Sequence, residues 1–447
     1  MSKDFKNDMK ILNDIKEHIS DLLIKLQIGY YSRIDETHYS AIQRQFLAKQ
    51  LKLAKKYVPF YQKLLKGKNI TENNCFEILS NLPILDKKAL KEIGKDAYAS
   101  YVDTNWQIWH NTGGSTGQPF NFPAGGNSKF NLPGELFCQA SLYKRMAGTY
   151  NLNIASIDGS RVPDEEINKN IFWTENKKNF PYGNIHFSTL YLNKNTFPYY
   201  LAKLNKIKPD VMRGYPSGFL EFASLLQESE HKLDFHLKSI YLTSENIIQE
   251  QSDYIASIFG CKVWGQYGHS EASIFAVKAP NETTYECHPL YGITEIIKED
   301  GTHAKKGETG EIVVTGFQYS AMPFIRYRTG DIAEFGGTRN GIVILKQLLG
   351  RSRDYIINKS GEKVFLVGLI FGGHLKAFNV IDGWQIIQNV PGLLSVNIKK
   401  SHSYTTDTEK EIIRLFASKD FNITIKYVDA IPKTIRGKQQ FLIQNIR

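Results

Sequence analysis

The sequence predicts an α/β (α+β) fold with a large N-terminal part and a small C-terminal part. Short β-rich runs such as residues 239–242 alternate with helical stretches such as 218–228, which is typical of layered α/β structure. From about residue 285 to residue 344 the strand-like runs become close-set. After Gly350 an α+β pattern returns and continues to the end. These patterns exclude an all-helical or an all-β protein.

The first 100 residues are predicted to be mostly helical. Apolar residues recur at helical spacing at 11–26 and again at 42–65. Asp86 has the position and side chain of an N-cap for a further helix. This region therefore forms a helical entry to the layered part.

Glycine-rich turns separate three strand-like runs within residues 285–344, which favours an antiparallel sheet or a small barrel-like part beside two α/β layers. The change of pattern near residues 350–354 marks a domain boundary. We therefore predict an N-terminal domain at 1–350 and a small, mobile C-terminal domain at 351–447.

The chain carries 56 Lys and Arg against 45 Asp and Glu, a formal net charge of +11. This balance suits anionic ligands such as nucleotides, nucleic acid or an acidic membrane surface. Many lysines, however, lie singly on predicted helices, as at residues 51–66, so a solvated helix face explains the excess better. Because no nucleic-acid-binding motif accompanies the charge, nucleic acid is not an expected partner.

Cysteine content and hydropathy indicate a cytoplasmic protein. The cysteines are far apart and form no CxxC pair, which favours a reducing compartment. Residues 1–16 are charged and lack the apolar core of a signal peptide. No run of about 18 apolar residues exists, so no transmembrane segment is expected. The four cysteines are Cys75, Cys138, Cys261 and Cys287.

A glycine-rich segment at residues 110–120 reads HNTGGSTGQPF. Glycine allows backbone turns with positive φ and lets amide groups approach an anion, and hydroxyl groups add donors. The segment therefore predicts a phosphate-binding loop, although it is not a Walker A motif and an ordinary surface loop would have the same composition. The candidate ATP-binding residues are Thr112, Gly113, Gly114, Ser115, Thr116 and Gly117.

This loop resembles the phosphate-binding loop of the adenylate-forming (AMP-binding, acyl-CoA synthetase-like) enzymes, whose usual form is [ST]SGTTGxP or [ST]GSTGxP. Gln118 stands where many members carry lysine, which shifts the expected phosphate contacts toward backbone amides. Other signature segments follow this loop in the family's order. The resemblance as a whole covers the chain from about residue 40 to the end. The opening segments and RGYPSG resemble the branch of phenylacetate–CoA ligases and CapK-like capsular polysaccharide biosynthesis proteins.

Residues 266–273 read QYGHSEAS and resemble the family's YGxTE segment. The resemblance implies that Glu271 coordinates Mg²⁺, a hard cation that takes carboxylate and phosphate oxygens. It also places Tyr267 and Gly268 beside the adenine and the substrate carboxylate, and Ser270 keeps the hydroxyl of the usual threonine. The nucleotide-binding residues implied here are Gln266, Tyr267, Gly268, His269 and Ser270.

Two further segments resemble parts of the nucleotide and acid sites. Ser244 and Glu245, in YLTSENI, match a strand end that flanks adenine, although a helix N-cap at Ser244 would explain the same residues. Tyr215, Pro216 and Ser217 match a segment near the acyl pocket.

The segment YRTGD at residues 327–331 resembles the ribose-binding signature, which implies that Asp331 accepts hydrogen bonds from both ribose hydroxyls. Residues 350–364 resemble the family's hinge segment. That resemblance implies a ribose or phosphate contact for Arg351 and puts the hinge position on Arg353, where Asp or Lys is usual.

The segment IPKTIRGKQ at residues 431–439 resembles the terminal PKTxxGK signature. It implies that Lys438 is the catalytic lysine of adenylation, since a flexible ammonium can reach the α-phosphate. Lys433 and Arg436 are competing candidates, and a plain basic tail is the alternative.

The resemblance implies an AMP-forming ligase that uses ATP and Mg²⁺ to activate a carboxylic acid and passes the acyl group to CoA or to an amine such as an amino sugar, in capsular or surface polysaccharide biosynthesis. An amide ligase and a non-catalytic nucleotide-binding assembly factor are the alternatives. The sequence identifies neither the acid nor the oligomeric state. Some relatives hold zinc with nearby Cys and His, but for Cys287 and His288 simple packing is the favoured interpretation.

Overall fold

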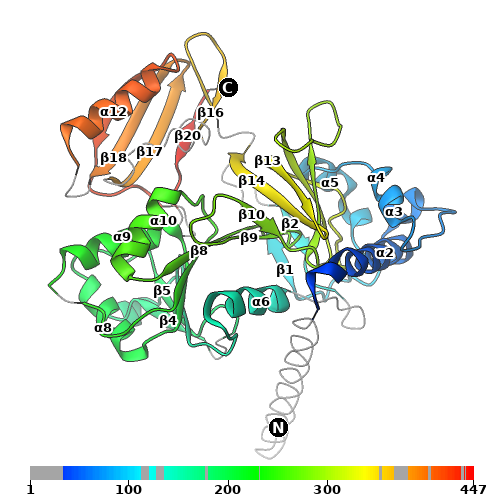
Figure 1. Ribbon diagram of the computed structural model, residues 1–447, viewed down its shortest axis with the longest axis horizontal. Helices are drawn as coiled ribbons and strands as arrows, with labels where there is room; N and C mark the ends of the chain where they lie inside the picture. The colour runs from blue at the N-terminus through cyan, green and yellow to red at the C-terminus, as the bar shows by residue number, and fades with distance from the viewer. Residues whose placement is uncertain are drawn as a thin grey trace, which may run out of the picture.

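The computed structural model describes residues 34–111, 120–126, 135–176, 180–230, 232–351, 355–366, 381–400, 404–433, 437 and 439–446 (Figure 1). Within these ranges a twelve-stranded sheet forms the centre of the molecule, and a smaller four-stranded sheet lies at the C-terminal end. This mixed α/β architecture confirms the predicted fold class. No helix in the described ranges is long and apolar enough to cross a membrane.

Helices cover one end of the large sheet, near the start of the described chain. The predicted helical run at 42–65 is interrupted at Val58, which is extended because Pro59 follows it. Asp86 is confirmed as an N-cap, since its Oδ1 accepts a hydrogen bond from the Ala89 amide at 2.8 Å. The run predicted at 11–26 lies outside the described residues. The helices are α2 (Tyr39–Tyr57), α3 (Pro59–Leu64), α4 (Cys75–Ser80) and α5 (Lys87–Ile93), with 3₁₀ turns η1 (Glu36–His38) and η2 (Gly94–Ala97).

The large sheet joins a parallel part to an antiparallel part. Its order is β11-β12-β13-β14-β10-β9-β8-β7-β6-β3-β5-β4 in the described chain. The parallel part is β3 (Ile154–Asp158), β5 (Ile185–Ser188), β6 (Val211–Gly214), β7 (Ser239–Thr243) and β8 (Lys262–Gly268). The other strands are β4 (Trp173–Glu175), β9 (Phe275–Lys278), β10 (Tyr285–Cys287), β11 (Gly292–Ile297), β12 (Thr309–Gly316), β13 (Tyr327–Arg339) and β14 (Ile342–Arg351). The antiparallel strands predicted at 285–344 are therefore present, and they continue the same sheet.

Both faces of the parallel strands are buried, as their continuous apolar sequences require. Successive side chains point to opposite faces, so in β7 Ile240 packs with one hydrophobic core and Tyr241 with the other. The helices on these faces are α6 (Glu135–Ala147), on the side of Tyr241, and α8 (Phe197–Ile207), α9 (Pro216–Glu228) and α10 (Gln249–Phe259), on the side of Ile240. A short helix α7 (Asp164–Ile167) follows β3.

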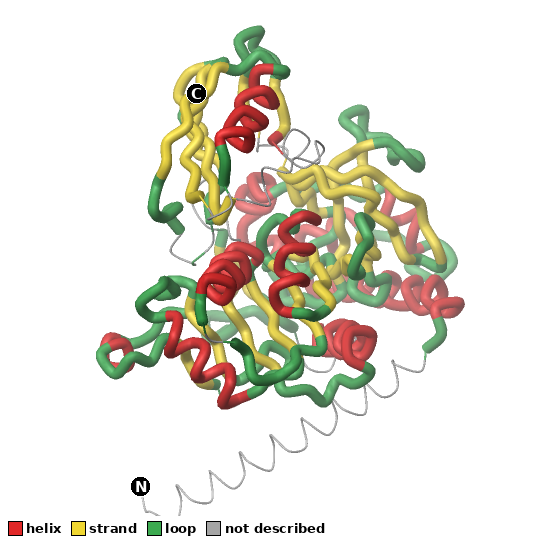
Figure 2. The backbone as a smooth tube through the Cα atoms, turned by 60° about the vertical axis from the view of Figure 1, so that its left-hand side comes forward, coloured by secondary structure: helices red, strands yellow, loops and turns green. Residues whose placement is uncertain are grey.

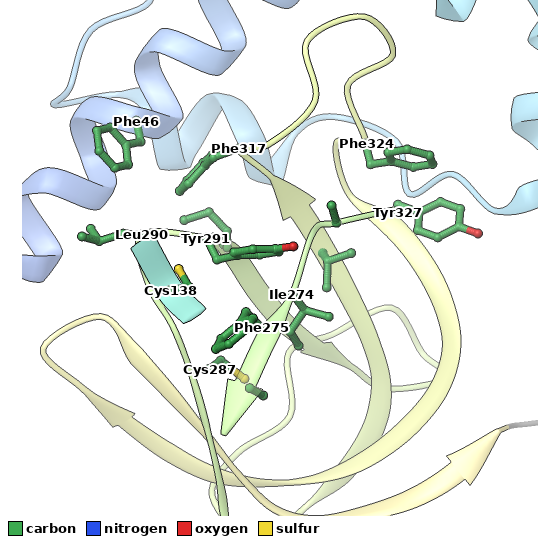
Figure 3. Packing of buried hydrophobic residues seen from close by; sticks show 14 of the residues in the cluster. Phe46, Cys138, Ile274, Phe275, Cys287, Leu290, Tyr291, Phe317, Phe324 and Tyr327 are labelled. Atoms are coloured by element: carbon green, nitrogen blue, oxygen red, sulfur yellow. The ribbon is translucent and has the colours of Figure 1, made fainter. Parts of the chain in front are cut away.

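Cys287 and His288 are core residues. Cys287 lies beside Phe275 in the larger core (Figure 3). His288 lies between the rings of Tyr39 and Phe137, at centroid distances of 5.9 and 5.5 Å, and burial lowers the pKa of His288 to about 4. The described residues contain no group of three or more His, Cys, Asp or Glu that could hold a metal ion. The packing interpretation therefore accounts for both residues.

The C-terminal residues have a sheet and a core of their own. In the described chain the order of this sheet is β19-β18-β17-β20, and α12 packs on one face of it (Figure 2). The elements are β15 (Tyr355–Ile357), β16 (Lys363–Phe365), β17 (Ile381–Val390), β18 (Leu393–Lys400), α12 (Thr406–Ala417), β19 (Asn422–Tyr427) and β20 (Leu442–Gln444). The described residues of this core begin at Ile356, and the domain boundary near residues 350–354 stays a prediction.

Candidate active site

The predicted site segments meet at one edge of the large sheet. Strands β6, β7 and β8 are parallel neighbours, with Gly214 opposite Leu242 and Thr243 opposite Gln266. Their carboxyl ends therefore lie side by side, which is where open α/β sheets bind ligands. The segments that follow these strands contain Tyr215, Pro216 and Ser217, then Ser244 and Glu245, then Tyr267, Gly268, His269, Ser270 and Glu271.

Three of the eight residues other than glycine with a left-handed backbone conformation in the described chain lie in or beside the site segments. Ser244, Ala272 and Arg326 have φ values of 72°, 47° and 47°. Such conformations cost about 1–3 kcal/mol each in residues other than glycine, and they cluster at functional sites. The N-cap interpretation of Ser244 is wrong, because α10 begins only at Gln249 and its N-cap is Ile248.

Glu271 is a buried carboxylate, with 7% of the residue exposed. The Tyr327 hydroxyl donates a hydrogen bond to its Oε1 at 3.0 Å, and Nδ1 of His269 lies 3.0 Å from its Oε2. This His269 contact does not have the geometry of a hydrogen bond. Burial alone would raise the pKa of Glu271, but His269 and the hydrogen bonds outweigh it and hold this pKa below its usual value. The side chain is therefore an anion at neutral pH.

Asp331, on β13, is the second carboxylate of the site. The Tyr267 hydroxyl donates to its Oδ2 at 2.6 Å, which ties the β8 end to β13. Asp331 also lies opposite Arg351 in the β13–β14 ladder, so the two predicted ribose-contacting residues are neighbours on paired strands. Gln266 lies near the carboxyl end of β8, opposite Thr243 of β7, and its Oε1 accepts a hydrogen bond from the Thr243 hydroxyl at 2.6 Å.

The stem of the predicted phosphate-binding loop reaches this edge. The strands β1 (Trp109–Asn111) and β2 (Asn121–Pro123) pair antiparallel, with Asn111 opposite Asn121. The Tyr319 hydroxyl lies 2.9 Å from Nδ1 of His110 and 3.4 Å from the carbonyl oxygen of Ser270, so it connects the stem to the Glu271 segment. The loop residues lie outside the described ranges and stay predictions, namely Thr112, Gly113, Gly114, Ser115, Thr116, Gly117 and Gln118.

Glu245 connects the sheet edge to the C-terminal part of the chain. Its carboxylate accepts hydrogen bonds from the amide and the hydroxyl of Ser217, at 2.9 and 3.0 Å, and thereby caps the first turn of α9. Its Oε1 also accepts from the amide of Gln439 at 3.0 Å. Both carboxylate oxygens therefore hold protein donors, and the predicted adenine contact of this segment stays a prediction.

The residues on both sides of Lys438 dock on this edge. The carbonyl of Gly437 accepts from the Thr189 hydroxyl at 3.2 Å, while Gln439 binds Glu245. Upstream, Nζ of Lys433 donates to the carbonyl of Thr189 at 2.7 Å and to Glu221 on α9 at 2.8 Å. Through these two contacts, the Lys433 ammonium holds the C-terminal segment against the large sheet and α9.

Three predicted functional residues cannot be placed from the described chain. They are Arg353, Arg436 and Lys438, together with the side chain of Arg351. Their roles stay predictions.

Sequence reasoning missed several residues that the structure brings to the site. Tyr327 is the first residue of YRTGD, so its place in a signature was a usable signal for its hydroxyl. Thr189, which follows β5, and Glu221, on α9, lie in segments without a motif, and their role appears only from the contacts that Lys433 makes with them. Tyr319 likewise lies in a loop with no distinguishing pattern.

The chain is similar to known proteins in sequence and in fold. Residues 356–445 match the family model of the CapK C-terminal domain. The chain is 24% identical to Protein CapK of Staphylococcus aureus over 423 residues, which covers 91% of this chain and 89% of that one. It is 29% identical to indoleacetate–lysine synthetase of Pseudomonas savastanoi over 223 residues, covering 48% and 47% of the two chains.

Among solved structures, 2-hydroxyisobutyryl-CoA ligase in complex with R3-HIB-AMP has a similar fold. The TM-score is 0.66 at 16% identity, over 90% of this chain and 88% of that one. The likeness therefore extends over both the large and the small part of the molecule. The chain is therefore similar in sequence to Protein CapK, with a CapK C-terminal domain match at residues 356–445, and it has a fold like that of 2-hydroxyisobutyryl-CoA ligase.

Proposed function

We propose that this chain is an AMP-forming ligase, which activates a carboxylic acid with ATP as an acyl-adenylate and passes the acyl group to CoA or an amine. The observation that carries the proposal is the docking of Gly437 and Gln439, on either side of Lys438, at the sheet edge that holds Glu271. Similarity to an amino-acid-conjugating synthetase and to a CoA ligase supports the same chemistry.

The nucleotide would lie across the ends of β7, β8 and β13. Asp331 is oriented by the Tyr267 hydroxyl on its Oδ2, and a carboxylate has further lone pairs to accept from the ribose hydroxyls. The β1–β2 stem brings the predicted phosphate-binding loop to the Ser270 carbonyl through Tyr319. The base and the phosphates would therefore lie on opposite sides of the Glu271 segment.

The residues at the Glu271 position fit a magnesium ion. Glu271 is anionic, its Oε1 is oriented by Tyr327, and Mg²⁺ in nucleotide sites commonly uses one or two carboxylates plus phosphate oxygens. When bound there, the ion would neutralise charge on the ATP phosphates. His269 would then hold the remaining Glu271 oxygen in place.

In the first step, an oxygen of the substrate carboxylate forms a bond to the α-phosphorus, and the bond from that phosphorus to the pyrophosphate oxygen breaks. No protein nucleophile is needed, so positioning and electrostatics supply the catalysis. We assign to the Lys438 ammonium the negative charge that develops around the α-phosphate. Backbone contacts of Gly437 and Gln439 would hold that lysine at the site.

In the second step the acceptor must reach the acyl-adenylate. In the described ranges, the contacts that dock the C-terminal segment on Thr189, Glu221 and Glu245 are polar, so they can break without exposing a large apolar surface. We propose that residues 351–447 rotate about the segment that contains Arg353, which removes Lys438 from the site.

ATP–pyrophosphate exchange tests the adenylation step, because it requires only ATP, the acid and Mg²⁺. A panel of carboxylic acids should contain at least one that supports exchange. Product analysis with CoA and with amines, amino sugars included, then separates an acid–thiol ligase from an amide ligase. If no acid in a broad panel supports exchange while ATP binds, the non-catalytic assembly factor becomes the better explanation. The name of the CapK relative supports testing acceptors from surface polysaccharides.

Replacement of Gly437 by alanine is expected to slow exchange by about 10²-fold, the effect of misplacing a catalytic group by about 1 Å. Gly437 has φ of 71°, and a Cβ there would lie 2.6 Å from Cα of Gly159 and 2.7 Å from Oγ1 of Thr189. Because one of these atoms, Cα of Gly159, belongs to the backbone and cannot rotate aside, the segment that contains residue 437 must move away from the sheet edge.

Gly361→Ala is the matched control for this variant. Gly361 has φ of 84° in the same C-terminal part, but a Cβ there meets nothing within 4 Å. It therefore shares the conformational strain without the clash, and exchange should stay at the wild-type rate. Equal losses in the two variants would show that general destabilisation, and not docking, limits the reaction.

A further inference from the structure

Arg213 is a guanidinium that the adenylation mechanism does not use, at the same sheet edge. It lies in β6 one residue before the strand ends at Gly214, and it is opposite Tyr241 of β7. The two side chains therefore share the face that α6 covers. The guanidinium carbon is 4.6 Å from the ring centroid of Tyr182 and 5.3 Å from that of Tyr241.

The Arg213 charge has no ionic partner in the described part of the chain. No described carboxylate lies within the 4.0 Å ion-pair distance of its nitrogens, and its Nε is buried without a hydrogen-bond acceptor. The carboxylate of Glu135 lies in this region, but it accepts a hydrogen bond from the Tyr182 hydroxyl. A half-buried guanidinium in this state is unfavourable unless an acceptor is supplied.

The two tyrosine rings decide where such an acceptor could lie. Aromatic rings attract a cation over their faces, whereas the N–H donors of a guanidinium lie in its plane. Tyr182 and Tyr241 therefore hold the Arg213 cation, while its Nε has no acceptor in the described chain. A water molecule could accept from Nε but would leave the positive charge unpaired. A carboxylate would satisfy both, because its oxygens match the planar donors in pairs.

The position of Arg213 relates this charge to the acid substrate. Two residues later the chain enters Tyr215–Pro216–Ser217, the segment predicted to border the acyl pocket. The Glu245 carboxylate accepts hydrogen bonds from both Ser217 and Gln439. The Arg213 charge is thus next in sequence to the proposed acyl site, and β7 alone separates its strand β6 from β8, which leads into the Glu271 segment.

We propose that Arg213 binds a second carboxylate of the acid substrate, so that the chain activates dicarboxylic acids in preference to acids of the same skeleton with an uncharged tail. This inference rests on the proposed adenylation function and names its substrate class. Arg213 would bind the tail carboxylate, while the other carboxylate reacts with ATP.

Matched acids test the inference in ATP–pyrophosphate exchange with the full-length protein. The pairs are succinate with butyrate, glutarate with pentanoate, and terephthalate with 4-methylbenzoate. For the best skeleton, the wild-type kcat/KM should be about 10²-fold higher for the diacid, since leaving a buried charge unpaired is costly. In Arg213→Met the ratio should fall to about one or below, because the charge is lost. Arg213→Lys should keep a preference for the diacid.

Arg145→Met is the control. Arg145 also lies over an aromatic ring, 5.4 Å from the Trp264 centroid, but it already pairs with Glu286 at 3.2 Å. Its replacement should leave the diacid preference unchanged, and thermal unfolding checks that each variant folds.

The outcomes separate the inference from the proposed function. If the acids with an uncharged tail support exchange at rates equal to or above those of the diacids, the proposed role of Arg213 is overturned and the adenylation function still stands. An unchanged ratio in a folded Arg213→Met variant would do the same. If Arg213→Met does not fold, the wild-type preference and the Arg213→Lys ratio decide. Absence of exchange with every acid would remove the proposed function itself.

Discussion

The variant Lys438→Ala should form acyl-adenylate about 10²–10³-fold more slowly than the wild type while it still binds ATP, because it removes a single charge from a developing anion. The contacts that dock its segment come from the backbone of Gly437 and Gln439, so the alanine variant should still dock. ATP–pyrophosphate exchange measures the chemical step, and calorimetric titration with ATP measures binding.

Lys426→Ala is the matched control for this experiment. Lys426 is an exposed residue of β19 in the same C-terminal sheet, so its loss changes net charge equally without affecting the site. A Lys438→Ala variant with full exchange activity would move the catalytic role elsewhere. Lys433 would be the first residue to test, although its ammonium is already bound to Thr189 and Glu221.

The variant Glu271→Gln should lose at least about 10²-fold in exchange rate and require more Mg²⁺, since the metal supplies several kcal/mol of charge stabilisation. Glutamine keeps the shape of the side chain, and its oxygen can still accept from Tyr327. Because the pKa of Glu271 lies below its usual value, the wild-type anion is present at and above the ordinary carboxylate range and is lost only on acidification below it. Exchange measured against Mg²⁺ concentration at neutral pH checks this prediction.

Glu334→Gln is the control for the loss of one carboxylate. Glu334 lies on β13 near Asp331, where it pairs with Lys346 at 2.7 Å. Its replacement should leave the Mg²⁺ dependence as in the wild type. A Glu271→Gln variant with wild-type Mg²⁺ dependence would contradict the metal role and leave Glu271 as a structural partner of Tyr327.

Much of the fold could be predicted because it depends on local patterns. The β-rich runs, the helices that follow them and the N-cap at Asp86 arise from side-chain periodicity and from short-range hydrogen bonds. The helix interruption at Val58 was also readable in principle, since a residue before proline avoids the helical conformation. What local patterns could not predict was that β9 and β10 join the antiparallel strands to the parallel ones in a single sheet.

The candidate site likewise contains residues that the sequence motifs could predict and partners that only the structure reveals. Glu271, Asp331 and Tyr267 lie in signature segments, and the structure brings these segments together at one sheet edge. The partners that orient them, such as Tyr327, come from strands distant in sequence. The N-cap interpretation of Ser244 failed because the chain turns there with a positive φ and continues before α10 begins.

The sequence by itself determined which side chains are available, through the order of the loop, YGHSE, YRTGD and terminal GK segments, and it determined the layered fold through apolar periodicity. Packing, in contrast, brings Glu245 between α9 and Gln439 and places Arg213 against two tyrosines, with no ionic partner among the described residues. The reason is physical. A motif records chemistry along the chain, whereas pairing, burial and charge compensation depend on residues from different segments that only packing brings together.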